Sequence, residues 1–112
     1  MTPKSETALW IAQRASAAVL ALCVAVHLVT IIHAVRGGLS AADILGRTRG
    51  SAAWFGFYSI FVLAVTLHAP IGLRSVFGEW LGWRGRSRDL VLLLFSVMIF
   101  FMGMRAVVSV LA

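Results

Sequence analysis

Three long apolar segments constrain the fold of this chain more than any other feature of its sequence. They run over about residues 9–35, 52–74 and 89–111, and a helix needs roughly 20 apolar residues to cross a hydrocarbon core of about 30 Å. Hydrophobic residues make up 61% of the chain and charged residues only 12%, whereas a soluble domain is usually about half apolar and a quarter charged. The sequence therefore predicts an all-α integral membrane protein with three transmembrane helices, and residues 1–112 form a single transmembrane domain.

The basic residues gather at the ends of these segments. The net charge of +6 would suggest a nucleic-acid partner in a soluble protein, but this placement favours anionic lipid and membrane orientation instead. The N-terminal region and the link between the second and third segments must share one side of the membrane. They hold Lys4, Arg14, Arg74, Arg84, Arg86 and Arg88, against Arg36, Arg47 and Arg49 in the other link. We therefore expect a cytoplasmic N-terminus and no nucleic-acid partner.

His68 lies inside the second apolar segment. An ionisable side chain in hydrocarbon is costly and usually functional, and neutral imidazole is among the commonest metal ligands. Gly72, one turn along the same face, leaves space for a flat macrocycle, and Pro70 frees the carbonyl of Thr66 because it has no amide hydrogen. We expect His68 to be an axial ligand of a haem b iron. The alternatives are an interhelical hydrogen bond for His68 and plain helix packing for Gly72.

The histidines of the first and second segments lie at different depths. At about 1.5 Å per residue, His68 is some 8–10 Å from the inner end of its helix, whereas His27 is nearer the outer face. Two axial imidazole nitrogens are only about 4 Å apart, at metal–nitrogen distances near 2 Å. A bis-histidine haem at His68 therefore needs its second ligand from another polypeptide. For His27, ligation and an interhelical hydrogen bond remain alternatives, and His33 is expected at the wetted interface.

Two short motifs carry a family resemblance. The second segment reads His68-x-x-x-Gly72-x-Arg74, with Glu79-Trp80 following, and the first segment contains Gln13-Arg14-Ala15-Ser16-Ala17. These motifs resemble those of the membrane-anchor cytochrome b subunits of succinate dehydrogenase and fumarate reductase. That family typically reads His-x-x-x-Gly-(Ile/Leu) and then Asp-Tyr or Asp-Phe, with (His/Gln)-Arg-x-(Ser/Thr)-(Gly/Ala) near the start of its first helix. The resemblance covers nearly the whole chain.

The resemblance implies roles for the matching residues. His68 falls on the axial ligand of haem b, and Arg14 on an arginine near the quinone and the haem propionates. Trp80 falls where one of the two anchor subunits carries a quinone-binding tyrosine, and Glu79 on its acidic neighbour. An indole N–H can donate a hydrogen bond but cannot accept one or ionise, so Trp80 serves as a donor or marks the other anchor subunit. Ser16 is a further candidate for the quinone site.

Several of these residues also have an ordinary structural explanation. Arg14 can be a topology residue that snorkels to the interface, and Trp80 an ordinary interfacial tryptophan. Some anchors of this superfamily hold two haems, and His27 with Arg105 near the propionates would fit that variant, although one haem is the simpler expectation. Arg105 can instead snorkel outward or pair with a partner helix.

The function expected from the sequence is that of a haem b-binding anchor of a succinate:quinone oxidoreductase. The quinone is ubiquinone or menaquinone, and the location is the bacterial inner membrane rather than the mitochondrial one. The chain has no flavin or cluster motif and no complete active site. Its expected partners are therefore a second anchor subunit, an iron–sulfur subunit docked on the basic second link, a flavoprotein subunit and the bilayer. A haemless anchor, a cytochrome b subunit of another membrane dehydrogenase and a structural membrane protein remain alternatives.

Overall fold

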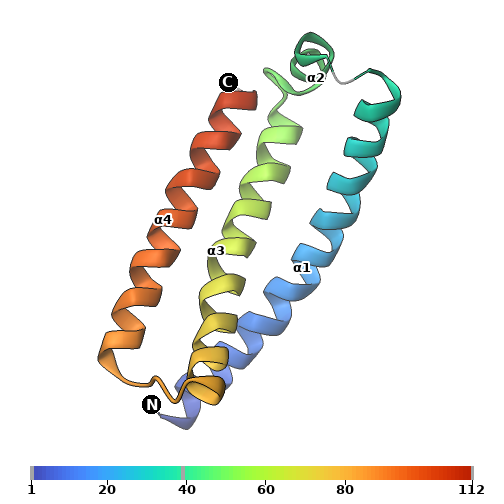
Figure 1. Cartoon of the computed structure of the whole chain (residues 1–112). Coiled ribbons are helices and arrows are strands. Elements are labelled where there is room, and N and C mark those ends of the chain that lie inside the picture. Colours follow the sequence, from blue (N-terminus) through green and yellow to red (C-terminus); the bar gives the residue numbers. More distant parts are fainter. Residues whose placement is uncertain (1, 39, 112) are drawn as a thin grey trace.

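The computed structural model describes residues 2–38 and 40–111, which form four helices (Figure 1). These are α1 (Pro3–Arg36), α2 (Ala41–Thr48), α3 (Ala52–Trp80) and α4 (Arg86–Leu111). The helices α1, α3 and α4 have 34, 29 and 26 residues and are long and apolar enough to cross a membrane. The prediction of an all-α membrane protein with three spans is thus confirmed.

All three spans are longer than the apolar segments predicted, α1 and α3 by the most. The helix α1 begins at Pro3, where the side chain of Thr2 accepts a hydrogen bond from the Ser5 amide at 3.1 Å. The helix α3 begins after Ser51, which caps the Trp54 amide at 3.3 Å, and it continues past the hydrocarbon-length segment to Trp80. Capping side chains satisfy amides that have no partner inside the helix. Polar helix ends therefore extend beyond the apolar runs.

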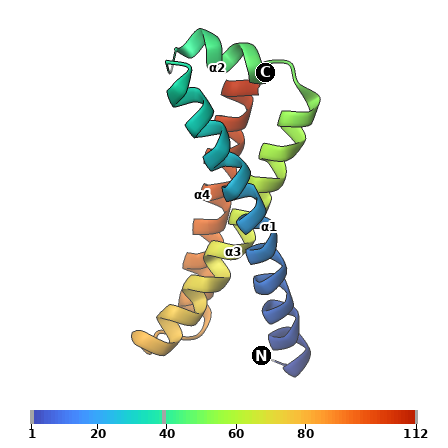
Figure 2. The same cartoon turned by 90° about the vertical axis from the view of Figure 1, so that its right-hand side faces the viewer.

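The helix α3 is central to the arrangement. It packs against both α1 and α4, while α2 contacts α4. Figure 2 shows that α1 and α3 cross obliquely. We call the end of the bundle where α1 begins and α3 ends the N-terminal end, and the opposite end the α2 end. At the α2 end, the amide of Gly50 donates to the carbonyl of Leu111 at 2.8 Å, which ties the link before α3 to the last turn of α4.

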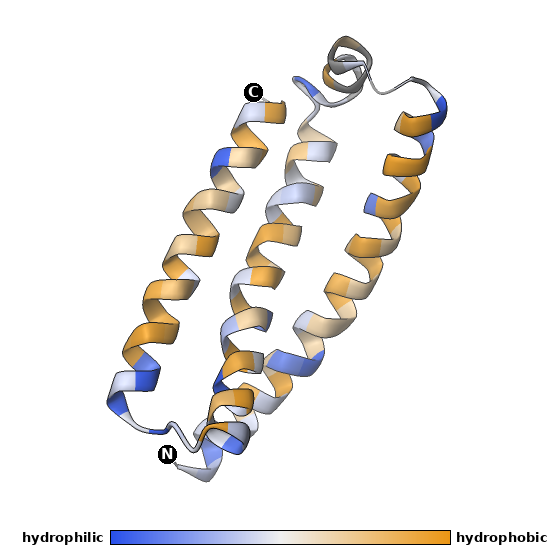
Figure 3. Ribbon diagram, in the orientation of Figure 1, coloured by the Kyte–Doolittle hydropathy of each residue, from blue (hydrophilic) through white to orange (hydrophobic). Residues whose placement is uncertain are grey.

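The outer faces of the spans are apolar, and the interior contact area is small. Figure 3 shows hydrophobic residues along the three spans, with many of the hydrophilic ones near the helix ends. Among the described residues, the buried apolar side chains are Cys23, Ala64, Leu92, Val107 and Leu111. Large exposed side chains such as Leu22, Leu94 and Phe101 suit contact with lipid or with neighbouring helices, because hydrocarbon carries no penalty for apolar surface.

Close packing of α3 against α4 depends on a small residue. A Cβ atom on Gly103 would lie 2.7 Å from one methyl carbon of Val62 and 2.9 Å from the other. Small residues let membrane helices approach closely, which increases the van der Waals contact that holds them together. Gly103 therefore sets the separation of α3 and α4 in the half of the bundle nearer α2.

Pro70 lies inside α3, and a side chain of α4 compensates for its missing amide hydrogen. The carbonyl of Thr66, which the sequence predicts to be free, accepts a hydrogen bond from the Ser96 hydroxyl at 3.0 Å. Water is absent from the bilayer core, so a backbone carbonyl there must be satisfied by the protein. The Ser96–Thr66 bond thus couples α4 to α3 two residues before His68.

The substitution Ser96→Ala should destabilise the folded protein by roughly 0.6–1.7 kcal/mol, the range for hydrogen bonds between membrane helices. In a Pro70→Ala background the cost should be clearly smaller, because the new amide of residue 70 can bond the Thr66 carbonyl within α3. Unfolding of the four proteins in lipid, measured as a double-mutant cycle, checks this coupling. Ser109→Ala, which removes a hydroxyl bonded only within α4, is the control. Equal costs of Ser96→Ala in both backgrounds would contradict the prediction.

Candidate functional site where α1 and α3 cross

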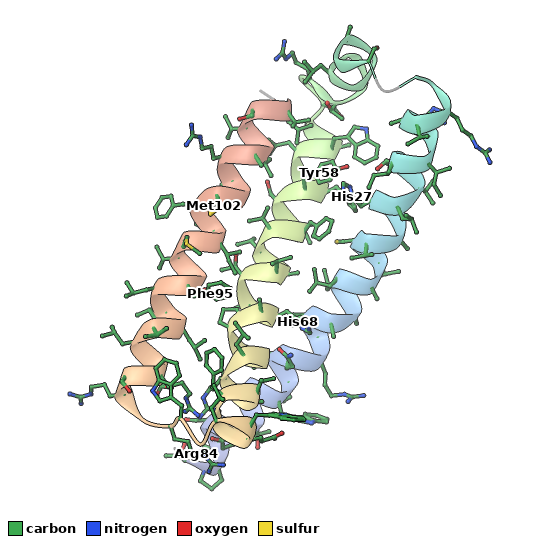
Figure 4. The ribbon with its side chains drawn as sticks, in the orientation of Figure 1. His27, Tyr58, His68, Arg84, Phe95 and Met102 are labelled. Atoms are coloured by element: carbon green, nitrogen blue, oxygen red, sulfur yellow. The ribbon has the colours of Figure 1, made fainter. Side chains whose placement is uncertain are left out.

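His68 is half-buried and lies on α3 against α1, in the half of the bundle nearer the N-terminal end (Figure 4). Its ring nitrogen Nδ1 is 3.4 Å from the hydroxyl oxygen of Ser16. Ser16 is only 5% exposed, and its hydroxyl also donates to the carbonyl of Gln13 at 3.1 Å. The structure thus brings Ser16 to His68, whereas the sequence had placed Ser16 among the quinone-site candidates.

The second ring nitrogen of His68 is not engaged by the chain. Among the side chains and backbone groups that the structure describes, none hydrogen-bonds Nε2. Histidines that bind metals almost always use the other ring nitrogen to donate to a neighbouring acceptor. The arrangement, with Nδ1 on Ser16 and Nε2 without a partner, has the form of an imidazole ligand.

Gly72 lies one turn beyond His68, against the side chain of Gln13. A Cβ atom at Gly72 would be 3.2 Å from Nε2 of Gln13, so the glycine permits a close approach of α1 in this conformation. Oε1 of the same Gln13 side chain is buried and has no hydrogen-bond partner. Unpaired buried polar atoms are uncommon because they lose their solvation without compensation. The sequence motif includes Gln13 but assigned it no role, although its position three residues before Ser16 places both on one face of α1.

The predicted quinone residues lie near the N-terminal end and are open to the surroundings. Arg14 is exposed, with its guanidinium 5.2 Å from the centre of the Trp10 ring. Trp80 is 81% exposed, and Glu79 next to it is also exposed. Within the part of the chain that the structure describes, no hydrogen bond or ion pair joins Arg14, Glu79 and Trp80 to one another. They offer free polar groups to a molecule or subunit outside the chain.

Arg74 of the second motif links α3 to the first turn of α1. Its Nη2 atom lies 3.4 Å from the carboxylate of Glu6, and the Arg74 side chain is 21% exposed. A partly exposed ion pair contributes little stability. The ion pair instead joins α1 to α3 between His68 and the N-terminal end of the bundle.

Two of the arginines in and next to the link between α3 and α4 bind other groups of the same chain. The Arg84 guanidinium donates to the carbonyl of Gly78 at 3.2 and 3.4 Å, near the end of α3. Arg88 is buried at 7% exposure and pairs with Asp89 at 3.1 Å. Arg86 is exposed. Of the arginines of the second link, Arg84 and Arg86 are therefore accessible, whereas Arg88 is buried beside Asp89.

His27 belongs to a separate polar pair nearer the α2 end (Figure 4). Its Nδ1 atom is 3.3 Å from the hydroxyl of Tyr58, a partner that sequence reasoning did not identify. Tyr58 precedes His68 by ten residues on α3, which corresponds to about 15 Å along the helix. This separation agrees with the depth difference expected between His27 and His68, and Figure 4 shows the two at different levels.

The His27–Tyr58 pair borders an apolar pocket of about 800 Å³ between α1, α3 and α4. His33, Trp54 and Gly103 also line this pocket. Arg105, which was considered as a propionate partner for a second haem, is exposed and lies outside the lining. The structure thus does not bring His27 and Arg105 together around one cavity.

No bare-metal site of the usual kind is found in the described ranges, since they contain no group of three or more His, Cys, Asp or Glu side chains able to hold an ion. A haem iron is different, because the porphyrin supplies four of its ligands and the protein supplies only axial ones. Haem ligation by His68 therefore stays a prediction at this point.

Comparison with known proteins identifies the family. A family model described as "Succinate dehydrogenase/Fumarate reductase transmembrane subunit" matches residues 1–106. The matched region includes both sequence motifs, the crossing of α1 and α3, and most of α4. No curated protein and no solved structure gave a match. The chain therefore belongs to the family of succinate dehydrogenase/fumarate reductase transmembrane subunits, the multi-pass membrane anchors of multi-subunit complexes.

Proposed function

We propose that this chain is a haem b-binding anchor of a succinate:quinone oxidoreductase and that His68 is an axial ligand of the haem iron. The observation that supports the proposal most strongly is the hydrogen bonding of the His68 imidazole where α1 and α3 cross. Its Nδ1 is held by Ser16, and no described residue bonds Nε2. A histidine in this position of a family anchor, inside the bilayer, is expected to have a function.

The surroundings of His68 fit a haem as well. The amide nitrogen of Gln13 lies against Gly72, and its buried amide oxygen has no partner within the described chain. Rotation of the amide would present its NH₂ group instead, because oxygen and nitrogen exchange places. Gln13 can therefore hydrogen-bond either an acceptor or a donor on a bound group. The haem, when bound, would supply one-electron transfer through its iron.

The second axial ligand is proposed to come from a second anchor subunit. His27 is bonded to Tyr58 and lies about 15 Å from the level of His68, so it is too far away to complete the same haem. We favour one haem over two, because Arg105 lies outside the pocket that His27 borders. The haem would then lie at the boundary between two polypeptides.

The quinone is proposed to react near the N-terminal end of the bundle. Arg14 and the indole N–H of Trp80 are exposed there and can donate to carbonyl oxygens that become more basic on reduction. Exposed Glu79 can pass protons from water. Ubiquinone and menaquinone share the carbonyl chemistry these groups recognise. The excess of basic residues at this end favours its placement on the cytoplasmic side of the membrane. Arg84 and Arg86 would meet the iron–sulfur subunit on that side. The proposed location of the complex is a bacterial inner membrane.

A haemless anchor of the same complex is the second candidate. The Ser16 contact at 3.4 Å already gives His68 one polar partner between helices. Hydrogen bonds of this kind stabilise membrane bundles without any cofactor. In that case His68 would stabilise the helix bundle, and the complex would show no b-type haem absorption that depends on His68.

Substitution of His68 separates these two candidates. In the purified complex, His68→Ala should abolish the b-type absorption in a reduced-minus-oxidised spectrum, because the iron loses a protein ligand. His27→Ala should keep that absorption, since His27 lies at another level. Co-purification of the flavoprotein and iron–sulfur subunits shows that each variant assembles. An unchanged b-type spectrum in an assembled His68→Ala complex would sink the ligand assignment.

Substitution of the exposed donors tests the quinone site. Arg14→Ala and Trp80→Phe should each lower kcat/KM for quinone reduction by about three- to tenfold, as expected for loss of one hydrogen bond. Succinate oxidation with a soluble dye acceptor should be unaffected, because it bypasses the quinone. Trp83→Phe is the matched control, since Trp83 stacks on Phe77 at 5.3 Å and its indole bonds Ser87 inside the chain. Equal quinone kinetics for Trp80→Phe, Trp83→Phe and the unchanged protein would rule out the role of Trp80.

A further inference from the structure

Ser16 makes two polar contacts with a single hydroxyl hydrogen. Its oxygen is 3.1 Å from the carbonyl of Gln13 and 3.4 Å from Nδ1 of His68. A carbonyl can only accept, so the shorter contact uses the hydroxyl hydrogen, as serines in helices often do with the carbonyl three residues earlier. Toward His68 the serine oxygen is then an acceptor. This contact requires a hydrogen on Nδ1.

The other nitrogen of the ring leads to the same assignment. A neutral imidazole carries one hydrogen, on either Nδ1 or Nε2. A hydrogen on Nε2 would point at no acceptor among the described residues, and an unpaired N–H in hydrocarbon is costly. A doubly protonated ring would add a charge inside the membrane, which is costlier still. The ring hydrogen therefore lies on Nδ1.

We propose that Ser16 is a positioning residue, which holds His68 in the tautomer protonated on Nδ1 and keeps the lone pair of Nε2 free. Its own orientation is set by the Gln13 carbonyl one turn earlier on α1. The quinone role expected for Ser16 from the sequence is a separate prediction. The tautomer stands on the contacts alone, whereas its consequence for iron rests on the proposed function of His68.

The consequence for iron follows from hydrogen-bond chemistry. An acceptor on Nδ1–H makes the opposite nitrogen a stronger electron donor. A stronger donor stabilises ferric iron more than ferrous iron and so lowers the midpoint potential of the haem. Loss of the Ser16 oxygen should therefore raise that potential. A tenfold change in the relative binding of the two iron states corresponds to about 59 mV for a one-electron couple.

The first test measures the tautomer in the haem-free full chain. Nitrogen-15 NMR of histidine-labelled chain in lipid vesicles, with His27→Gln and His33→Gln present, reports His68 alone. Hydrogen on Nδ1 should dominate, Ser16→Ala should change the tautomer ratio by roughly 2- to 10-fold, and Ser16→Thr should restore it. Ser109→Ala, which removes a comparable back-bonded hydroxyl on α4, should have no effect. Hydrogen on Nε2 in the unchanged chain, or an equal ratio in Ser16→Ala, would overturn the proposal.

The second test is a redox titration of the purified complex. The haem potential should rise by up to about 59 mV in Ser16→Ala and stay near its original value in Ser16→Thr and Ser109→Ala. Haem lost from Ser16→Ala but retained in Ser16→Thr also supports the positioning role. Suppose that the haem potential is unchanged in Ser16→Ala and that haem is still lost in His68→Ala. The proposed influence of Ser16 on the iron would then be overturned, while ligation by His68 would stand. A b-type haem that survives His68→Ala would instead overturn the proposed function, and the NMR tautomer would still decide the role of Ser16.

Discussion

The absence of water from the bilayer interior is the constraint on which this structure depends. A polar group within a span is costly unless it has a partner in the protein, and here three such groups have one on a neighbouring helix, whereas buried Gln13 Oε1 and Ser59 Oγ have none among the described residues. Ser16 meets His68 between α1 and α3, His27 meets Tyr58 nearer the α2 end, and Ser96 bonds the Thr66 carbonyl from α4. These contacts set the register of α1 and α4 on α3, and they leave the Nε2 atom of His68 without a partner in the described chain.

The sequence was sufficient to predict the three spans and the separation in level between His27 and His68, because both depend on helix geometry along one segment. The free carbonyl of Thr66 was likewise predictable from Pro70. Its donor was not, since finding Ser96 requires the rotation and register of α4 against α3. The helix ends were underestimated because caps such as Thr2 extend α1 beyond its apolar run.

The site itself was only partly predictable. His68 was singled out from its unusual location, and its ligation of haem stays a prediction. Ser16 was named as a candidate for the quinone site, and its contact with His68 was not predicted. The fold turns that face of α1, with Gln13, toward α3. Charge counting likewise placed Arg88 on a docking surface, although its side chain is buried beside Asp89. Motifs and charge counts do not reveal which way a helix turns its side chains, and that direction made the difference in both cases.

The central claim is that His68 supplies one axial ligand and a partner subunit supplies the other. Pulsed EPR of the oxidised complex, assembled from nitrogen-15 histidine-labelled chain and unlabelled partners, tests it directly. With His27→Gln and His33→Gln present, His68 is the remaining histidine of the chain. We expect coupling of the iron to one labelled and one unlabelled imidazole nitrogen. Two unlabelled axial nitrogens, or no haem signal in the assembled complex, would contradict it.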